Sequence, residues 1–410
     1  MMDALAPSAG DGLAPAEETE IAAAVAEAHR AGEPLLVMGR GTKLGMLRPV
    51  QAARSLSTRN HAGITMYSPN ELVISARAGT PLPEVEAAVA ERGQMIVAEP
   101  PDLSGLMGEG VQTIGGIVAT NLSGPRRVGT GGAVRDQVMG VRAVNGTGEV
   151  IRSGGRVLKN VTGLDLAKLL TGSHGTLGVL TEITLKVLPR PESSGSLVLP
   201  GLDAARGVAA LSAALGSPYG VSGAAWLPAQ AAAGVPALAA FGAPVALLRI
   251  EEFESSVRYR LGKLREELAA WGRCEVLDDE ASQAAWRAVR DAAPLRAEPE
   301  EAVWRLSVRP SAGPGTVAAL EAAGLRAYLD WGGGLVWAAG PAGGAAHETV
   351  SAAAKAAGGV WMVMRAPEPL RAAVHVVPPE PEALARITRR VKAAMDPKGI
   401  LNPGRLYAGV

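Results

Sequence analysis

The sequence predicts an α+β protein of two or three domains. A chain of 410 residues is long enough for domains of about 150 residues that each bury a core. Helix and strand patterns alternate along it, and Pro189, Pro191 and the Glu-Ser-Ser-Gly run at 192–195 predict a boundary near residue 195. We therefore expect one domain over 1–195, a smaller α+β domain over 196–380, and a C-terminal helix and turn over 381–410.

The first domain alternates strand, tight loop and helix. We expect a helix over 17–31 that ends at Gly32, strands over 35–38 and 72–78, and a helix that Thr80 caps and Gly93 ends. Periodicity fails between 100 and 132, which predicts a long functional loop. A hairpin over 138–152, a helix over 165–170 and a strand over 179–188 follow.

The second part is expected to hold helices over 258–271 and 281–291 and strands over 245–250, 302–309 and 334–339. Residues 227–248 carry no formal charge, but three prolines interrupt them, so we expect an Ala-rich helix and a strand rather than a membrane span. A last helix over 382–395 leads into a rigid turn over 396–404 with two prolines and two glycines.

Composition excludes several function classes. The chain has 40 basic and 40 acidic residues and no run of Lys and Arg, which argues against nucleic acid as a partner. The lone Cys274 excludes an iron–sulfur cluster held by this chain's own cysteines, a Cys-rich zinc site and an intrachain disulfide. We expect no metal site, and Met1 to Glu20 lack the basic and apolar regions of a signal peptide.

Three glycine loops in the first domain point to a bound phosphate. They lie at 39–43, inside 100–132 and at 172–178. Glycine lets successive backbone amides converge on a phosphate oxygen, so a dinucleotide pyrophosphate is the natural ligand. The alternative is that these loops only connect strands. The chain lacks the P-loop motif, and Gly39-Arg-Gly41 is followed by Gly45, one residue too late for the Rossmann fingerprint.

At these loops the chain resembles the flavoproteins with a PCMH-type FAD-binding domain, also called the vanillyl-alcohol oxidase family. The segments that carry the resemblance are Gly39-Arg-Gly-Thr-Lys43, Thr113-Ile-Gly-Gly-Ile-Val-Ala-Thr-Asn121, Arg135-Asp-Gln-Val-Met-Gly-Val-Arg142, Lys159-Asn160, Gly163-Leu-Asp-Leu166, Gly172-Ser-His-Gly-Thr-Leu-Gly-Val-Leu-Thr-Glu182 and Asp396-Pro-Lys-Gly-Ile-Leu-Asn-Pro-Gly-Arg405. Within the family, the length, the spacing and the endings Val363-Met-Arg-Ala-Pro367 and Leu401-Asn-Pro-Gly-Arg405 most resemble the FAD-binding subunit of glycolate oxidases.

The resemblance implies a FAD-binding domain of two α+β subdomains, a smaller α+β cap domain and a C-terminal segment that returns to the FAD domain. It also implies the cofactor contacts. The pyrophosphate side would be formed by Gly39, Arg40, Gly41, Thr42, Lys43, Thr113, Ile114, Gly115, Gly116, Thr120 and Asn121. Pro101 and Asp102 would line the flavin side, and the ribose and adenine side would be formed by Gly172, Ser173, His174, Thr176, Gly178 and Val179.

Departures from the family pattern limit the catalytic assignment. Relatives that tether the flavin use a His or Cys, and residues 39–43 contain neither, so we expect noncovalent FAD. The His-rich motif with which relatives polarise a 2-hydroxy acid is missing, since the five His are scattered. His375, in an apolar segment at 372–377 expected to be a strand, is the weak candidate for a catalytic base, and a packed or rim histidine is the default.

The implied function is a FAD-dependent oxidoreductase subunit acting on CH–OH groups. It would oxidise a small 2-hydroxy acid, glycolate to glyoxylate, beside a second flavin subunit and an iron–sulfur subunit, in the cytoplasm or peripherally at the inner membrane through those partners. The lone Cys274 requires electrons to leave through another subunit or a quinone. The alternatives are a FAD-containing electron-transfer or scaffold subunit without its own substrate site, and a free-standing FAD oxidase of the same fold.

Overall fold

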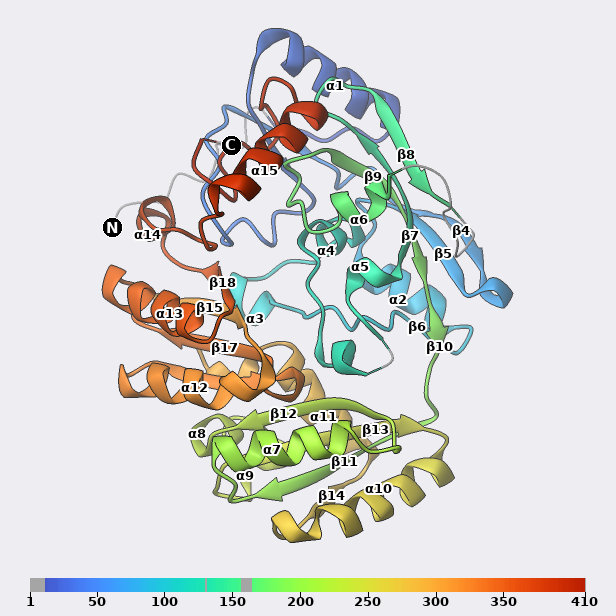
Figure 1. Ribbon diagram of the computed structural model, residues 1–410. Coiled ribbons are helices and arrows are strands. Elements are labelled where there is room, and N and C mark those ends of the chain that lie inside the picture. The colour runs from blue at the N-terminus through green and yellow to red at the C-terminus, as the bar shows by residue number, and fades with distance from the viewer. Residues whose placement is uncertain (1–11, 130, 156–163, 410) are drawn as a thin grey trace.

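The chain folds into two α+β parts that lie one above the other in a computed structural model (Figure 1). The structure describes residues 12–129, 131–155 and 164–409. The first eleven residues of the leader and the motif residues Lys159, Asn160 and Gly163 lie outside the described ranges. The upper part combines the N-terminal sequence with the last helix, and the lower part is the cap (Figure 1).

Two sheets form the FAD-binding part. A small parallel sheet has the order β1 (Gly12–Leu13), β3 (Arg54–Ser57), β2 (Leu35–Met38). A larger antiparallel sheet has the order β4 (Ile64–Ser68), β5 (Val73–Arg77), β9 (Val179–Lys186), β7 (Val138–Val144), β8 (Val150–Gly154). The hairpin expected over 138–152 is the β7–β8 pair, and β9 pairs with both β5 and β7 at the centre of the sheet.

Helices cover these sheets and correct two expectations. They are α1 (Glu18–Ala31), α2 (Leu82–Ala90), α3 (Ser104–Met107), α4 (Ile114–Thr120), α5 (Val134–Gln137) and α6 (Leu166–Leu170). The segment 100–132 is therefore not one long loop, because α3 and α4 lie inside it. Thr80 does not cap α2: the N-cap is Pro81, and the Thr80 hydroxyl donates to the carbonyl of Arg77 instead.

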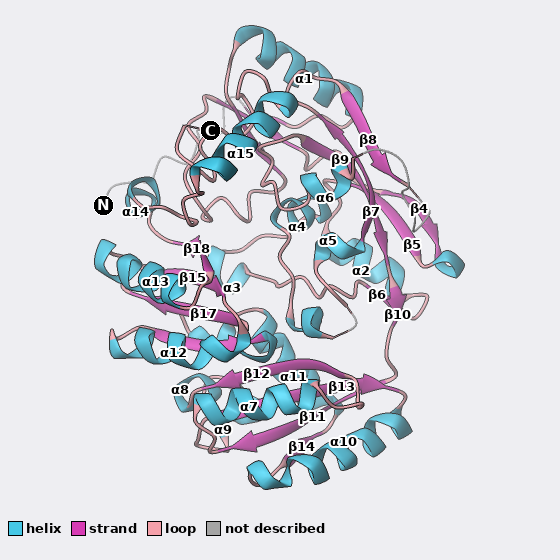
Figure 2. Ribbon diagram, in the orientation of Figure 1, coloured by secondary structure: helices cyan, strands magenta, loops and turns pink. Residues whose placement is uncertain are grey.

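The cap is built on an antiparallel sheet of eight described strands. Its order is β14 (Glu275–Leu277), β11 (Ser193–Pro200), β13 (Val245–Glu252), β12 (Val221–Leu227), β16 (Arg326–Asp330), β17 (Leu335–Gly340), β15 (Ala302–Ser307), β18 (Val360–Arg365). Only the pair Trp226 and Leu329 joins β12 to β16, so the sheet consists of two four-stranded halves (Figure 2). The largest hydrophobic core of the described chain lies here.

The helices of the cap pack on this sheet. They are α7 (Ala204–Leu215), α8 (Ala229–Ala232), α9 (Pro236–Ala239), α10 (Glu254–Leu268), α11 (Asp279–Arg290), α12 (Gly313–Ala322) and α13 (Gly344–Ala356). The uncharged stretch 227–248 forms the short helices α8 and α9 before β13, rather than one Ala-rich helix. Among the described residues, no helix is both long and apolar enough to span a bilayer.

The chain crosses from the FAD-binding part to the cap once and then returns. The short strand β10 (Leu188–Pro189) still pairs with β6 (Gln94–Met95), whereas β11 begins in the cap sheet at Ser193, and we propose the domain boundary between these two strands. After β18 and α14 (Glu368–Ala373), helix α15 (Glu382–Met395) lies against the FAD-binding part (Figure 1).

A buried ionic cluster joins the two parts. Arg249 on β13 donates to both carboxylate oxygens of Glu99, at 2.8 and 2.9 Å. Arg126 donates to both carboxylate oxygens of Glu251, at 2.9 and 2.7 Å. Glu99 and Arg126 belong to the FAD-binding part, so each pair spans the interface. Bidentate geometry and burial fix the orientation of the cap over the FAD-binding part.

Candidate cofactor-binding cleft

A cleft runs between the two sheets of the FAD-binding part. Its walls come from the end of β2 and the following loop, the start of α4, the loop before β9, and the C-terminal turn. Segments separated by more than 350 residues in the sequence therefore build one site.

The first glycine loop offers unpaired backbone donors. Within the described residues, the amide N–H groups of Arg40, Gly41, Thr42 and Lys43 have no acceptor, and all four residues line the cleft. Gly41 has φ of 79°, a left-handed value that glycine adopts without strain. Successive free N–H groups in such a turn form a concave site for an anion, so this loop fits a pyrophosphate.

Two buried arginines hold this loop in place. Arg405 donates to the carbonyls of Lys43 at 2.8 Å and Arg48 at 3.0 Å. Arg371 donates to the carbonyl of Leu47 at 3.1 Å and weakly to that of Leu44. These bonds turn the carbonyl groups of residues 43–48 toward the arginines. Burial, together with the neighbouring Arg371, lowers the pKa of Arg405 to about 10, so Arg405 is still a cation at neutral pH.

The second loop leads into helix α4. The Thr113 side chain caps the helix by accepting from the N–H of Gly116 at 3.1 Å, and the N–H of Gly115 donates to the carbonyl of Ala78 at 2.9 Å. These two amides are therefore already paired within the protein, although both glycines line the cleft. Their role is space: a Cβ on Gly115 would lie 2.7 Å from the Ala78 carbonyl oxygen.

The third loop and the C-terminal turn meet at Asn402. The Asn402 side chain accepts from the N–H of Val37 at 2.7 Å and donates to the carbonyls of Val37 at 3.0 Å and His174 at 2.8 Å. One amide group thus ties β2 to the third glycine loop. Burial, with a smaller effect from Arg405, lowers the pKa of His174 to about 3, so its imidazole faces the cleft as a neutral ring.

The cleft is electropositive. Arg40, Lys43 and Arg405 line it, and none of the described lining residues is Asp or Glu. Lys43 donates to the side chain of Gln112 at 2.9 Å, and burial lowers its pKa to about 8. Cations without carboxylate partners in the wall, next to four free amides, match the anionic centre of a dinucleotide. The residues present therefore fit FAD.

The structure brings most of the expected cofactor residues together. The lining includes Gly39, Arg40, Gly41, Thr42, Lys43, Thr113, Gly115, Gly116, Thr120, His174, Gly178 and Val179. Asp102 lies in a small adjoining pocket with Thr42 and Lys43, while Ser173 and Thr176 line a different groove beside α15. Pro101, Ile114, Asn121 and Gly172 lie outside the lining described for the cleft.

Sequence reasoning expected the C-terminal segment to return to the FAD domain, but it did not name the side chains of this turn as part of the site. Asn402 and Arg405 line the cleft, as do Thr58, Ala78, Ala119 and Gly175. The motif Leu401-Asn-Pro-Gly-Arg405 carries the signal, because a polar residue at each end of a Pro-Gly turn indicates a side chain used for binding. The local sequence does not indicate which distant backbone groups the side chains of Asn402 and Arg405 contact.

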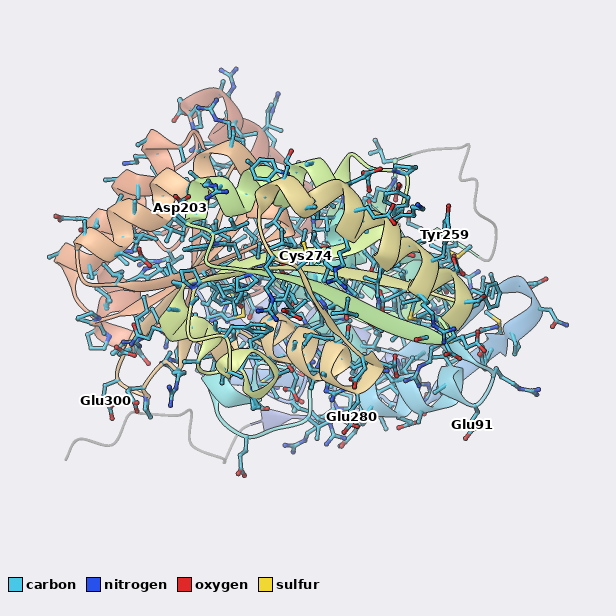
Figure 3. The ribbon with its side chains drawn as sticks, turned by 90° about the horizontal axis from the view of Figure 1, so that it is seen from below. Glu91, Asp203, Tyr259, Cys274, Glu280 and Glu300 are labelled. Carbon is cyan, nitrogen blue, oxygen red and sulfur yellow. The ribbon has the colours of Figure 1, made fainter. Side chains whose placement is uncertain are left out.

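Two other predicted features lie elsewhere. The segment 372–377 is not a strand: α14 ends at Ala373, and His375 is exposed beyond it, away from the cleft lining. Its carbonyl accepts from the indole N–H of Trp361. Cys274 is buried in the cap, where it is 4% exposed, and is labelled near the centre of Figure 3. Among the described residues, no cluster of His, Cys, Asp and Glu could hold a metal ion.

Comparison with known proteins supports FAD as the cofactor. The profile of the family described as "FAD binding domain" matches residues 13–154. Glycolate oxidase subunit GlcE of Escherichia coli is 35% identical over 92% of this chain and 93% of its own length. Glycolate oxidase subunit GlcD of Bacillus subtilis is 32% identical over 45% of this chain and 38% of its own length.

The fold likeness extends to solved structures. p-Cresol methylhydroxylase with substrate bound superimposes with a TM-score of 0.70 over 97% of this chain and 88% of that chain, at 12% identity. That identity is evidence for the fold alone, whereas the likeness to GlcE covers nearly all of both chains. The chain therefore belongs to the flavoproteins with a PCMH-type FAD-binding domain, and within them to the family of the glycolate oxidase subunit GlcE.

Proposed function

We propose that this chain is the FAD-binding subunit of a glycolate-oxidase-type complex, which oxidises a 2-hydroxy acid such as glycolate and passes the electrons to a partner. FAD-linked oxidation of 2-hydroxy acids is the chemistry that the relatives' names share. The observation that carries the proposal is the likeness to a subunit of glycolate oxidase over 92% of this chain.

Bound FAD supplies the two-electron acceptor for the alcohol carbon. The protein's own residues would position it. The free amides of residues 40–43 would bind the pyrophosphate, and the neutral His174, whose carbonyl accepts from Asn402, would line the other wall. Among the described residues that line the cleft, His174 is a weak proton acceptor at neutral pH because its pKa is lowered to about 3, and Lys43, with a pKa lowered to about 8, is still mostly a cation there. The chain's own contribution is thus binding, orientation and exclusion of water.

The exit route for electrons supports a partner. The only cysteine of the sequence is Cys274, and it is buried in the cap. A Cys-ligated iron–sulfur cluster needs several thiolates, so this chain supplies none. On this proposal a second flavin subunit, an iron–sulfur subunit or a quinone accepts the electrons.

A half-buried arginine on the cap supports an anionic substrate. Trp304 on β15 donates to His347 of α13, so the adjacent Arg305 points to the opposite face of the sheet, toward the FAD-binding part. Its guanidinium stacks 4.7 Å from the ring of Trp331, whose other contacts include Arg127 and the carbonyl of Gly124. Its Nε has no hydrogen-bond acceptor in the described protein. A free guanidinium at this interface suits the carboxylate of a 2-hydroxy acid.

The second candidate function is a FAD-containing electron-transfer or scaffold subunit without its own substrate site. The exposed position of His375 and the absence of an Asp or Glu from the described cleft lining favour it. Anaerobic mixing of the FAD-loaded chain with glycolate or lactate separates the two. Bleaching of the flavin band excludes the scaffold role. Bleaching only in the reconstituted complex excludes oxidation by this chain alone, and hydrogen peroxide formed in air by the single chain identifies a free-standing oxidase.

The substrate class and the cofactor linkage have their own tests. Arg305→Met is expected to raise KM for glycolate at least tenfold, with Arg305→Lys restoring part of the loss; an unchanged KM argues against the carboxylate contact. Acid precipitation of the purified chain is expected to release all of the flavin into the supernatant. Flavin that stays with the pellet would show a covalent bond and contradict the noncovalent assignment.

A further inference from the structure

Helix α15 has an uncovered apolar stripe. Leu384, Ile387 and Val391 follow at spacings of three and four residues, the pattern that places side chains on one face of a helix. Leu384 is 48% exposed and Ile387 57% exposed. An apolar stripe of this kind normally faces a core, yet here it faces outward.

Polar contacts also fix α15 to the FAD-binding part. The ammonium group of Lys392, which is 7% exposed, donates to the carbonyls of Thr176 at 2.7 Å and Leu401 at 2.9 Å and pairs with Asp396 at 2.8 Å. The helix is therefore held by a buried lysine at the third glycine loop.

The stripe borders an apolar groove between α15 and α6. Its apolar lining residues are Leu169, Leu177, Ile387, Val391, Leu406 and Tyr407. Leu169 on α6 is 37% exposed and Leu164, just before that helix, is 83% exposed. Partly exposed apolar side chains from two helices thus line one groove, and an exposed apolar surface of this kind in a soluble protein marks an interaction site. We call these residues together with Leu384 the α15 face.

Unpaired positive charge lies beside the α15 face. Arg386 and Arg390 are exposed, stand one helical turn apart, and make no ion pair within the described residues. The neighbouring Arg389, by contrast, pairs with Glu382. Like charges at this spacing repel each other on a helix, so the pair is unfavourable in the isolated chain. A carboxylate on a bound partner would remove that repulsion.

We propose that the α15 face is the docking surface for the partner subunit of the complex, and that it receives an amphipathic segment whose apolar side chains fill the groove while carboxylates flank them opposite Arg386 and Arg390. The proposal rests on the proposed function, which requires a partner. Charge complementarity selects an acidic, apolar segment of a protein over a basic one.

The test is co-expression of this chain, affinity-tagged, with the second flavin subunit and the iron–sulfur subunit of its complex. Ile387→Asp and Leu384→Asp are expected to reduce the co-purified partner subunits at least tenfold while FAD content stays at the wild-type level. Tyr259→Asp is the matched control. Tyr259 also has a large, mostly apolar side chain, is 64% exposed, and projects from α10 of the cap (Figure 3). The control variant should leave the complex intact.

Each other result overturns the proposal in a recognisable way. Full partner recovery with Ile387→Asp refutes the α15 face while the proposed function stands. A wild-type chain that recovers no partner subunit refutes the proposed function as well. If the chain alone is a dimer that Ile387→Asp dissociates, the occupant is a second copy. If the chain binds vesicles of phosphatidylglycerol through Ile387, the occupant is a membrane.

Discussion

Gly116→Val tests the position of the cofactor most directly. A Cβ on Gly116 would have only the Thr113 hydroxyl within 4 Å, at 3.3 Å, so the new side chain points into the cleft rather than into the protein. Extra methyl groups in a well-packed site cost about 1–3 kcal/mol. If FAD occupies this space, the substitution makes the binding free energy of FAD less favourable by this amount. At 1.36 kcal/mol per factor of ten, the affinity for FAD falls about 5–150-fold.

The assay is the ratio of flavin to protein absorbance after purification, followed by FAD titration of the stripped protein. Gly262→Val is the matched control, since Gly262 is exposed on α10 and a Cβ there has nothing within 4 Å. Gly115→Val is unsuitable, because its Cβ would collide with the Ala78 backbone and damage the fold. A Gly116→Val protein that keeps full FAD at wild-type affinity would refute the cleft assignment.

Three further predictions concern buried polar groups. Burial raises the pKa of Asp330 to about 7, so its ionisation destabilises the fold increasingly as pH rises from about 4 to 7. The Asp330→Asn side chain can still accept from the Trp331 N–H. At pH 8 this variant should be more stable than the wild-type protein by about 2–4 kcal/mol, as measured by thermal unfolding. A variant less stable than the wild type at pH 8 would contradict this. The arginines Arg249 and Arg126 lower the pKa of Glu251 to about 2, so its contribution is present above about pH 4.5 and is lost as pH falls toward 2. Glu251→Gln should lower the free energy of unfolding by about 3–5 kcal/mol at pH 7. It should also reduce the loss of stability that the wild-type protein shows as pH falls from about 4.5 toward 2; an unchanged pH dependence in this range would exclude Glu251 as its source. Asn402→Ala leaves buried backbone groups of β2 and the third loop unpaired, at about 1–3 kcal/mol each, and should lower both stability and FAD content; normal FAD content would show that the turn is only structural.

Local sequence was sufficient where local chemistry decides the structure. The helix over 382–395 has the predicted bounds, and the β7–β8 hairpin forms at the predicted turn. The first glycine loop was also predictable, since Gly41 adopts the left-handed backbone for which glycine was invoked. Helix α4 was missed because its residues Ile114-Gly-Gly-Ile read as loop by propensity. Its N-terminal Thr113 cap and its packing against β5 and β9 override that propensity.

Long-range contacts account for the rest. Nothing near Arg249 or Glu99 in the sequence indicates that they pair across 150 residues. The same holds for Arg405, whose acceptors are carbonyls some 360 residues earlier. Every residue type carries a backbone carbonyl, so the sequence does not show which carbonyls accept a side-chain hydrogen bond. A side chain that binds carbonyls can therefore be recognised as polar and placed in a turn, but its target emerges only from the fold.

The C-terminal segment connects the cofactor site with the proposed partner surface. Asn402 and Arg405 close the cleft, and Lys392 joins α15 to Thr176 in the third glycine loop. The third glycine loop lines the cleft through His174 and Gly178 and, at Thr176, accepts the hydrogen bond that anchors α15. One buried lysine therefore links a wall of the cleft to the helix that carries the α15 face.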